Sequence, residues 1–528
     1  MKQIYVFCFL LLVAGTLSAQ RPITGTVTDE SGSGLLGATV VAKGTAAGKI
    51  TDADGKFTLT MPTGVNTIVV SYTGYQTQEV DVTGQSTVNV VLLEAAGLLT
   101  ELVVTGYSEV ESKKLVSSVA VVGAKQLENI PMTDVNQLMQ GRAAGVYTTA
   151  NSGQPGAQQQ VRVRGTGSIT AGRNPLYVVD GIIIEQGNFA ALDAGTNAVD
   201  VLAQLNPNDI ENITILKDAT ATALYGSRGS NGVVVITTKR GKAGKTLITV
   251  KAQNGVTMPN FGNFELMNAE EAWNYERKVL ANSGRTQEQI DATRPASMLD
   301  NTTDWLDEAF RDGKTYNVEL QASGGNEKTR FFVSGGYFDQ DGILIGSEFN
   351  RFSLRSNIDH TASDRLSFSL NLNGSYSQQN NAVDGNRFQS PIASAFTTTP
   401  LQGKINPATG KLYTGIENEY IGLTGDNFLY SLPLNTVDVN TFRLISKLSA
   451  TYKILDNLSF TQNANIDLIG VDEVDYDDPT TADGVNDRGT LTTAFSQNRA
   501  LTSQSLLRYF TNFGQDHDFD VMAVYEYQ

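Results

Sequence analysis

Cysteine, histidine and tryptophan are all scarce in this 528-residue sequence. It contains one cysteine, two histidines and two tryptophans. The single cysteine, Cys8, excludes intrachain disulfides and cysteine-ligated metal sites. The histidines, His360 and His517, lie far apart in the sequence and offer no zinc-binding catalytic centre, and neither has a nucleophile at the spacing of a triad. We therefore predict no catalytic residue, no metal site and no cofactor.

Positive charge is also in short supply. There are 39 Lys and Arg residues against 55 Asp and Glu residues, which gives a formal net charge of −16. Nucleic-acid binding requires clustered Lys and Arg side chains to neutralise phosphates, and this balance argues against it. Glycine is frequent, at 50 residues, but aromatic and β-branched residues are plentiful, so the chain is neither collagenous nor disordered as a whole. Its length suggests about three or four folded units.

Long hydrophobic runs are missing, apart from one near the first residue. Residues 4–15 are apolar, follow Lys2 and precede small residues up to Ala19. A run of about a dozen residues is shorter than the roughly 20 that cross a bilayer as a helix, and the pattern is typical of a secretory signal peptide. We predict a signal peptide at residues 1–19 and export of the rest of the chain. Cys8 lies inside the apolar run, so it is not a lipid-attachment cysteine.

Residues 21–93 form several short runs in which apolar and polar positions alternate, separated by Gly, Asp and Asn. Short strands at this spacing predict a small antiparallel sandwich. Residues 51–55 (TDADG) suggest a calcium loop, but a frame that begins at Ile50 lacks an acidic first ligand and places Met61 at the twelfth position, so we predict a β-turn. The whole segment resembles the carboxypeptidase regulatory-like β-sandwich, a non-catalytic module.

Residues 94–113 form a linker that contains one short apolar strand, LVVTGY at 102–107. A free extended segment of this kind can add a strand to the edge of a partner's sheet, with affinity from main-chain hydrogen bonds and specificity from alternate side chains. The alternative is an ordinary edge strand of the following domain. The local pattern alone favours the edge strand.

Residues 114–241 mix helix and strand patterns and predict a compact α+β domain. Thr133 or Asp134 can cap a short helix, and Asp218 can cap another that stops at Gly226. The sequence GKT at 244–246 supplies the tail of a phosphate loop, but the glycine required earlier is missing and no helix pattern follows, so the match fails.

Four motifs in this domain carry a family resemblance. They are LMQGRAAGV at 138–146, VRVRG at 161–165, PLYVVDG at 175–181 and LKDATATALYGSRG at 216–229. In this order, after a regulatory-like sandwich, they look like the plug domain of SusC/RagA-type TonB-linked outer membrane proteins. The plug signature residues are Arg162, Arg164, Gly165, Asp180, Gly181, Lys217, Asp218, Tyr225, Gly226, Arg228 and Gly229.

The same resemblance changes the interpretation of the linker strand. In that context the segment looks like the family's TonB box, and docking becomes the favoured role. The box residues are Leu102, Val103, Val104, Thr105, Gly106 and Tyr107. Most of the plug signature is expected to set turns and packing rather than to contact cargo.

Residues 245–528 form long two-faced strands. Runs of about ten alternating residues, such as Leu366, Phe368 and Leu370 against Ser367 and Ser369, are what a membrane-spanning barrel strand requires. A soluble sandwich also alternates, but its strands are usually shorter, about 5 to 6 residues. We predict nine strands, near residues 246–256, 315–323, 329–338, 349–359, 365–377, 440–454, 457–469, 497–511 and 517–528.

The predicted connections alternate between short and long, which is typical of outer membrane barrels with short periplasmic turns and long outer loops. The long connections are residues 255–314, 339–348, 378–440 and 469–496. Nine strands are too few and odd in number for a closed barrel, whereas plugged transporters have about 22. We therefore expect an incomplete barrel, and a chain that is an N-terminal fragment and forms no working pore by itself. The predicted fold class is mainly β: sandwich, α+β plug and the first part of a transmembrane antiparallel barrel.

The long connections contain the remaining candidate sites. Residues 268–280 predict a helix capped by Asn268, with Glu271 completing a capping box. Trp273 and Trp305 can stack on sugar or peptide cargo, or they can pack the loop itself. Seven acidic residues between 472 and 487 can gather calcium, but a solvated loop is favoured.

By resemblance, the intact protein is expected to import oligosaccharide or peptide across the outer membrane of a Gram-negative cell. Its partners would be TonB, a SusD-like surface lipoprotein and outer membrane lipid, with no nucleic acid and no catalysis. Two alternatives remain open. One is a secreted or surface β-rich adhesin, and the other is a TonB-linked signal transducer, which would usually carry an additional periplasmic domain before the box.

Overall fold

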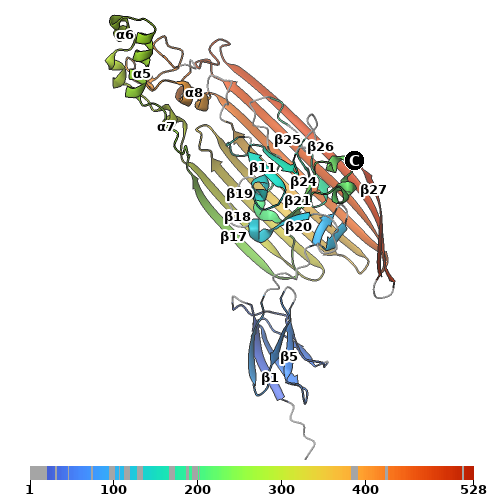
Figure 1. Ribbon diagram of the computed structural model, residues 1–528. Coiled ribbons are helices and arrows are strands. Elements are labelled where there is room, and N and C mark those ends of the chain that lie inside the picture. Colours follow the sequence, from blue (N-terminus) through green and yellow to red (C-terminus); the bar gives the residue numbers. More distant parts are fainter. Residues whose placement is uncertain are drawn as a thin grey trace, which may run out of the picture. The chain divides into compact units, whose positions relative to one another are not determined.

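The computed structural model describes residues 21–29, 32–45, 47–72, 75–93, 102–105, 108–111, 119–127, 135–150, 152–165, 173–185, 189–192, 200, 202–381, 390–422, 426–513 and 517–528 (Figure 1). The chain divides into two compact units, residues 1–103 with 109–115 and residues 104–108 with 116–528. The predicted signal peptide lies outside the described residues.

The first unit is a two-sheet sandwich with one apolar core. One sheet has the order β4-β1-β7 and the other β3-β2-β5-β6. The inward positions of each strand are apolar and include Ile23, Val40, Leu59 and Val70, as alternation over a half-buried sheet requires. The strands are β1 (Arg21–Thr28), β2 (Thr39–Ala42), β3 (Gly48–Ile50), β4 (Lys56–Met61), β5 (Thr67–Ser71), β6 (Gln78–Asp81) and β7 (Thr87–Val91).

The sandwich differs from the prediction in one respect, because β1 and β7 pair in parallel rather than antiparallel. The predicted β-turn at 51–55 is present. Asp52 accepts hydrogen bonds from the backbone N–H groups of Asp54 and Lys56, at 3.0 and 2.8 Å, and Gly55 adopts φ 76°.

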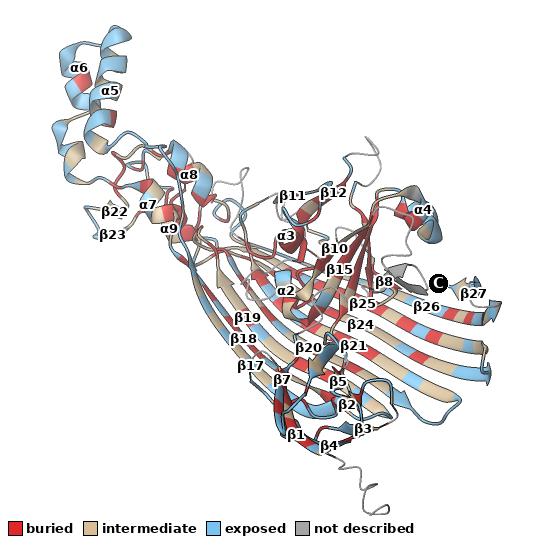
Figure 2. Cartoon of the chain, turned by 60° about the horizontal axis from the view of Figure 1, so that its bottom comes forward, coloured by how far each residue is buried: buried red, intermediate tan, exposed pale blue. Residues whose placement is uncertain are grey.

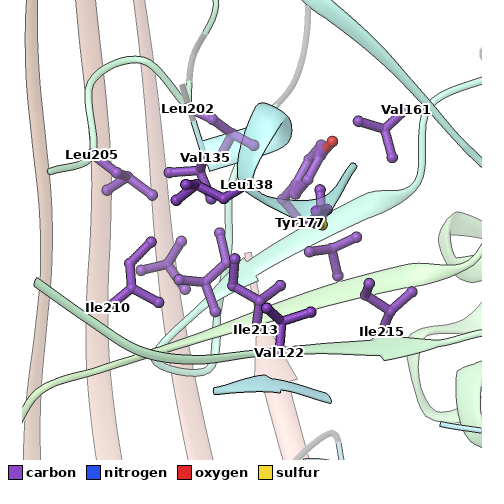
Figure 3. Packing of buried hydrophobic residues seen from close by; sticks show 14 of the residues in the cluster. Val122, Val135, Leu138, Val161, Tyr177, Leu202, Leu205, Ile210, Ile213 and Ile215 are labelled. Atoms are coloured by element: carbon purple, nitrogen blue, oxygen red, sulfur yellow. The ribbon is translucent and has the colours of Figure 1, made fainter. Parts of the chain in front are cut away.

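The α+β domain of the second unit is built on a five-stranded sheet of order β10-β15-β16-β13-β14, accompanied by the hairpin β11-β12. Strands β13 and β16 are parallel neighbours. Val135, Leu138 and Met139 of α3 pack with the apolar side chains of the sheet into one core (Figure 3). The strands are β10 (Val119–Gly123), β11 (Val146–Ala150), β12 (Gln159–Val163), β13 (Leu176–Val179), β14 (Ile182–Ile183), β15 (Ile210–Leu216) and β16 (Val233–Thr238). The helices are α2 (Ala124–Leu127), α3 (Val135–Met139), η2 (Pro207–Asp209), α4 (Ala219–Thr222) and η3 (Ala223–Gly229).

Nine long strands follow as one antiparallel sheet, in sequence order from β17 to β27. All nine strands predicted from the sequence are present, and each is longer than predicted or differs by a few residues at its ends. Their bounds are β17 (Gly244–Thr257), β18 (Gly313–Gly325), β19 (Thr329–Asp341), β20 (Glu348–Thr361), β21 (Leu366–Asn380), β24 (Thr436–Leu455), β25 (Leu458–Asp477), β26 (Thr490–Phe513) and β27 (His517–Tyr527). The sheet curves around the α+β domain, which lies against its inner face (Figure 1).

One predicted connection is wrong. The loop expected at 469–496 is mostly strand, because β25 continues to Asp477 and β26 already begins at Thr490. Of the acidic residues assigned to that loop, Glu473 is a buried strand residue. Within the described ranges, no group of three or more His, Cys, Asp or Glu side chains is placed to hold a metal ion.

Buried and exposed positions alternate along the strands of the large sheet (Figure 2). Many of the buried positions carry polar side chains, and many of the exposed positions carry apolar ones. In β18, Glu319 is 1 % exposed while its neighbours Val318 and Leu320 are 51 % and 55 % exposed. In β20, Arg355 is buried and Leu354 is exposed. A water-soluble protein buries its apolar side chains and exposes its charges, so this inverted arrangement indicates a sheet whose outer face meets an apolar environment.

The connections at one end of the sheet are long and carry their own secondary structure (Figure 1). The predicted helix is confirmed as α5, with Asn268 and Glu271 forming a capping box. The elements are α5 (Ala269–Asn282), α6 (Gln287–Thr293), η4 (Ala296–Asp300), α7 (Trp305–Ala309), α8 (Pro391–Thr397), β22 (Ile405–Asn406), β23 (Lys411–Leu412) and α9 (Phe428–Ser431). Among the described helices, none combines the length and hydrophobicity needed to cross a membrane.

Candidate functional site: the contact between the α+β domain and the sheet

The Asp-Gly pair after β13 places a carboxylate at the edge of the α+β domain. Asp180 and Gly181 adopt φ 49° and 83° and join two strands in which Val179 pairs with Ile182. A two-residue hairpin loop with positive φ at both positions is the turn that Asp-Gly favours. Because β13 and β16 are parallel neighbours, their ends meet at one edge, and Asp180 reaches Thr238 at the end of β16.

Asp180 joins the domain to the large sheet through a buried ion pair. Its Oδ2 contacts the Arg355 guanidinium of β20, and both side chains are 3 % exposed. Thr238 donates to the same carboxylate from its backbone N–H (3.1 Å) and its hydroxyl (2.8 Å). Asn357, two residues beyond Arg355 on the inner face of β20, donates to the Thr238 hydroxyl (3.0 Å) and to the Lys239 carbonyl (2.7 Å).

The protonation of Asp180 follows from these contacts. Burial raises the pKa of its carboxyl, but the positive charges of Arg355 and Arg240 and the hydrogen bonds from Thr238 outweigh that effect, so the pKa lies below its ordinary value. Asp180 is therefore ionised at neutral pH, and a true charge pair holds the two parts together.

A second buried pair lies on the other half of the sheet. Arg443 of β24 donates to Asp467 of β25 through Nε (3.0 Å) and Nη2 (2.8 Å), a bidentate arrangement. Asp467 also accepts the backbone N–H of Glu185 at 3.1 Å. Further along β25, Glu473 accepts the N–H groups of Ala191 (2.5 Å) and Leu192 (3.1 Å). Asp467 and Glu473 of β25 thus bind the backbone of the segment that follows β14.

A third group of contacts surrounds η2. Arg351 of β20 donates to the carbonyls of Ala203 and Leu205, the latter at 3.0 Å. Ser334 of β19 donates to Asp209 at 2.5 Å. Burial raises the pKa of Asp209 above its ordinary value, although Arg355 and the Ser334 hydrogen bond oppose the shift. Asn206 also donates to Glu319 of β18 at 3.2 Å. Residues of three neighbouring strands, β18 to β20, therefore form hydrogen bonds with the same short turn.

Comparison with known proteins agrees with this architecture. The TonB-dependent Receptor Plug Domain family matches residues 111–233, and the CarboxypepD_reg-like domain family matches residues 23–104. TonB-dependent receptor P3 of Formosa agariphila is 32 % identical over 536 residues, covering 99 % of this chain and 49 % of that relative. TonB-dependent receptor SusC of Bacteroides thetaiotaomicron is 35 % identical over 389 residues, covering 71 % of this chain and 37 % of that relative.

The chain belongs to the SusC/RagA type of TonB-dependent receptors. Its fold matches the RagAB peptide importer in the open-open state with a TM-score of 0.68 at 23 % identity, over 81 % of this chain and 48 % of that chain. The mainly β fold class, with a regulatory-like domain, a plug and part of a barrel, is confirmed. The chain spans about half the length, or less, of the curated relatives it matches.

The remaining signature residues of the plug lie mainly in turns and packing contacts. Arg164 forms an ion pair with Asp218, the residue before α4, and Lys217 donates to the Ala144 carbonyl at 2.7 Å. Gly226 breaks η3 with φ 61° and ψ −147°, a backbone conformation open to glycine. These residues fix how the motifs of the plug meet one another.

Five other signature positions complete the set. Arg162 donates to Gln160 within the same strand at 2.9 Å, and Arg228 donates to Gln528 at 3.1 Å. Gly165 follows the 161–163 strand residues with φ 99°. Gly229 is buried against Thr222, whose carbonyl lies 3.0 Å from where a Cβ would stand, and Tyr225 lies within η3. Among the signature residues, Asp180 contacts a buried charge of the barrel, Arg355.

The predicted TonB box lies at the division between the two units. Residues 102–105 form β8 (Leu102–Thr105), which pairs with β9 (Ser108–Glu111) in a separate two-stranded sheet. The edge-strand alternative placed this segment in the sheet of the following domain, and the described pairing is instead with β9. Gly106 and Tyr107 lie outside the described residues.

The two tryptophans both lie in the long connections. The Trp273 indole donates to the carbonyls of Arg294 (3.1 Å) and Pro295 (3.2 Å) and lies 4.5 Å from the Arg277 guanidinium, so it holds α5 to the end of α6. Trp305 is 3 % exposed and packs edge-on against Phe428, with ring centroids 5.6 Å apart. A role for either residue in cargo contact stays a prediction.

Sequence reasoning missed three residues on the barrel's side of this site, Arg351, Arg355 and Arg443, and it assigned Glu473 to an acidic loop. The available signal was a charged residue at an inward position of an alternating strand, as in the run that contains Asp467. A charge inside a barrel strand needs a partner, and the partner here is the plug or a neighbouring strand.

Proposed function

We propose that the whole protein imports oligosaccharide or peptide nutrients across the outer membrane, powered through TonB and assisted by a SusD-like surface lipoprotein. The observation that carries this proposal is a plug held inside a barrel sheet by buried charge pairs, with Asp180 and Arg355 as the central pair. An adhesin has no need of a stopper inside a barrel, and a transporter does.

The polarity of the sheet supports a location in a membrane, and the relatives support the outer membrane. Leu320 and Leu354 point outward and Glu319 and Arg355 inward, which suits a lipid-facing exterior and a wet interior. In this proposal residues 1–19 direct export, residues 21–93 form the sandwich, residues 94–113 the linker with the box, residues 114–241 the plug and residues 245–528 the barrel. The chain carries no catalytic step.

Energy would enter through the box. A two-stranded hairpin is only marginally stable in water, so the pairing of β8 with β9 is easily exchanged for pairing with a strand of TonB. Strand addition depends on main-chain hydrogen bonds, and the paired strands can transmit a pulling force. Pulling on the linker would then act on the plug through residues 119–127, which form β10 and α2, the first described strand and helix of the plug.

Two known proteins support import. The structural neighbour RagAB is named as a peptide importer, and the chain is also related in sequence to SusC. The proposal therefore includes both oligosaccharide and peptide as cargo classes.

Replacing Val103 by Pro tests the proposal in the full-length receptor. Proline removes one main-chain donor and disfavours a paired strand, so energised uptake of a labelled nutrient is expected to be lost while binding at the cell surface remains. Val103→Thr is the matched control, because threonine keeps the donor and the extended conformation. Uptake that survives Val103→Pro would reject this assignment of the box.

A further inference from the structure

A cleft of about 730 Å³ lies among the long connections of the barrel. It is lined by residues 264–276 with gaps, 302–306 and 395–400, which belong to the segment around α5, the start of α7 and the end of α8. Its size lies within the range of about 300–1,000 Å³ that is typical of ligand sites. The contacts between the plug and the barrel described above make no use of it.

The wall of the cleft exposes an unusual amount of apolar surface. Phe264, Leu266, Met267, Tyr275 and Phe396 all line it, and each is more than 40 % exposed, with Tyr275 at 57 %. The rings of Phe264 and Phe396 meet edge-on with centroids 5.7 Å apart, so two different connections build one aromatic wall. A contiguous apolar patch of this kind marks a surface that binds something.

The charges of the cleft are of one sign. Its lining contains Glu265, Glu271, Glu276 and Asp304 and includes no Lys, Arg or His. Glu271 and Asp304 cap helices, and Glu276 pairs with Arg294. Within the described part of the chain, Glu265 has no hydrogen-bond or ion-pair partner. The lining of the cleft is therefore acidic, and it favours a cationic ligand.

The framework behind the wall is well packed. Trp305 and Ala395 line the cleft from a buried cluster that also contains Phe428 and Leu344. The capping box at Asn268 fixes the start of α5. A preformed wall loses little conformational entropy when it binds.

We infer that this cleft binds an extracellular peptide cargo that carries basic side chains next to aromatic or aliphatic ones. The exposed rings and Leu266 match the apolar side chains, and the unpaired Glu265 with its acidic neighbours matches the basic ones. A neutral glycan has no positive charge to interact with the acidic side chains of the lining. The inference names a cargo class and so rests on the proposed function.

Direct binding to the full-length receptor in phosphatidylcholine nanodiscs tests this inference. The probe is a fluorescein-labelled octapeptide of alternating Lys, Leu and Phe residues. The comparison ligands are the same peptide with Glu in place of Lys and a neutral glucose oligosaccharide. We expect the basic peptide to bind at least about tenfold more tightly than the acidic one, with an affinity that falls as salt is added.

Three cleft substitutions and two controls locate the binding. Tyr275→Ala and Phe396→Ala remove exposed rings of the wall and are expected to weaken binding about tenfold each, and Glu265→Gln is expected to weaken it and reduce its dependence on salt. The controls Val279→Ala and Glu270→Gln change exposed residues of α5 that do not line the cleft, and they are expected to leave affinity within about twofold. Circular dichroism confirms that each variant is folded.

Three results would overturn the inference: equal affinity for the acidic peptide, oligosaccharide binding that is lost in Tyr275→Ala, or peptide binding unaffected by all three cleft substitutions. Failure of the import proposal looks different. In that case the basic peptide binds at the cleft with the expected pattern, and Val103→Pro leaves uptake unchanged.

Discussion

Asp180 of the plug and Arg355 of the barrel form a buried ion pair, in which each side chain is 3 % exposed. The two residues are separated by 175 positions in the sequence. This pair is a direct electrostatic link between the plug and the barrel sheet.

Removing Arg355 leaves the buried Asp180 carboxylate without its ion-pair partner. We expect Arg355→Ala to destabilise the seated plug by about 3–5 kcal/mol, measured as a lower urea midpoint for exposure of the plug to protease. Arg508→Ala is the matched control, because Arg508 pairs with Asp520 on an exposed surface and should cost about 0–1 kcal/mol. Equal shifts in the two variants would contradict a special role for the Asp180 pair.

Glu473 should protect a short stretch of plug backbone from exchange. Its carboxylate accepts the N–H groups of Ala191 and Leu192, so Glu473→Ala is expected to speed amide hydrogen exchange in the 189–192 segment. Asp472 is its exposed neighbour on the opposite face of β25, and Asp472→Ala should leave that exchange unchanged. Faster exchange in both variants would indicate a general loosening of β25 instead.

The long connections should respond to pH near neutrality. Burial, together with the nearby charge of Asp483, raises the pKa of Asp426 to about 7, against the opposing hydrogen bond from Ser431. A raised pKa in the folded state means that the stabilisation is fully present below the ordinary value of 3.8 and is lost as pH rises through about 7. The cluster around Phe428 should therefore open more easily at alkaline than at acidic pH.

Trp305 reports on that cluster because it packs on Phe428. In a Trp273→Phe background, the fluorescence of Trp305 can follow denaturant-induced unfolding of the cluster. The denaturant concentration at the midpoint should decrease when the pH is raised from 6 to 8, because the pKa of about 7 lies in that interval. Asp426→Asn keeps an acceptor for Ser431 and removes the titration, so its midpoint should vary less with pH. A wild-type midpoint that rises with pH would refute the assignment.

The free-energy cost of a charged residue on the outward face of the barrel should depend on its depth in the bilayer. Leu354 is 54 % exposed in the middle of β20, and Leu354→Arg is expected to cost about 2–4 kcal/mol when the strand lies in a bilayer. Thr361→Arg, at the end of the same strand, should cost about 0–1 kcal/mol. Folding into lipid vesicles, followed by urea titration, measures both. Similar costs at the two sites would argue against a membrane around this face.

The periodicity of the sequence was enough to predict the strands of the barrel. Side chains alternate strictly across a strand, so the apolar positions 366, 368 and 370 identified one face and the intervening serines the other. The capping box at Asn268 was equally local, because its partners lie three residues apart. The parallel pairing of β1 with β7 was not predictable, since period-two alternation carries no information on strand direction.

The sequence alone thus predicted the class of each segment. Alternation between neighbouring positions indicated the sandwich and the two-faced barrel strands, while the plug was identified by its resemblance to a known family and export was predicted from residues 1–19. Only the tertiary structure decided which buried charges meet, as when the Asp-Gly turn at 180–181 delivers a carboxylate to Arg355 and when β25 turns Glu473 toward the plug. It also brought the exposed rings of Phe264 and Phe396 into one wall. Such pairings join residues more than a hundred positions apart, and their energies depend on burial and distance, which only a folded chain defines.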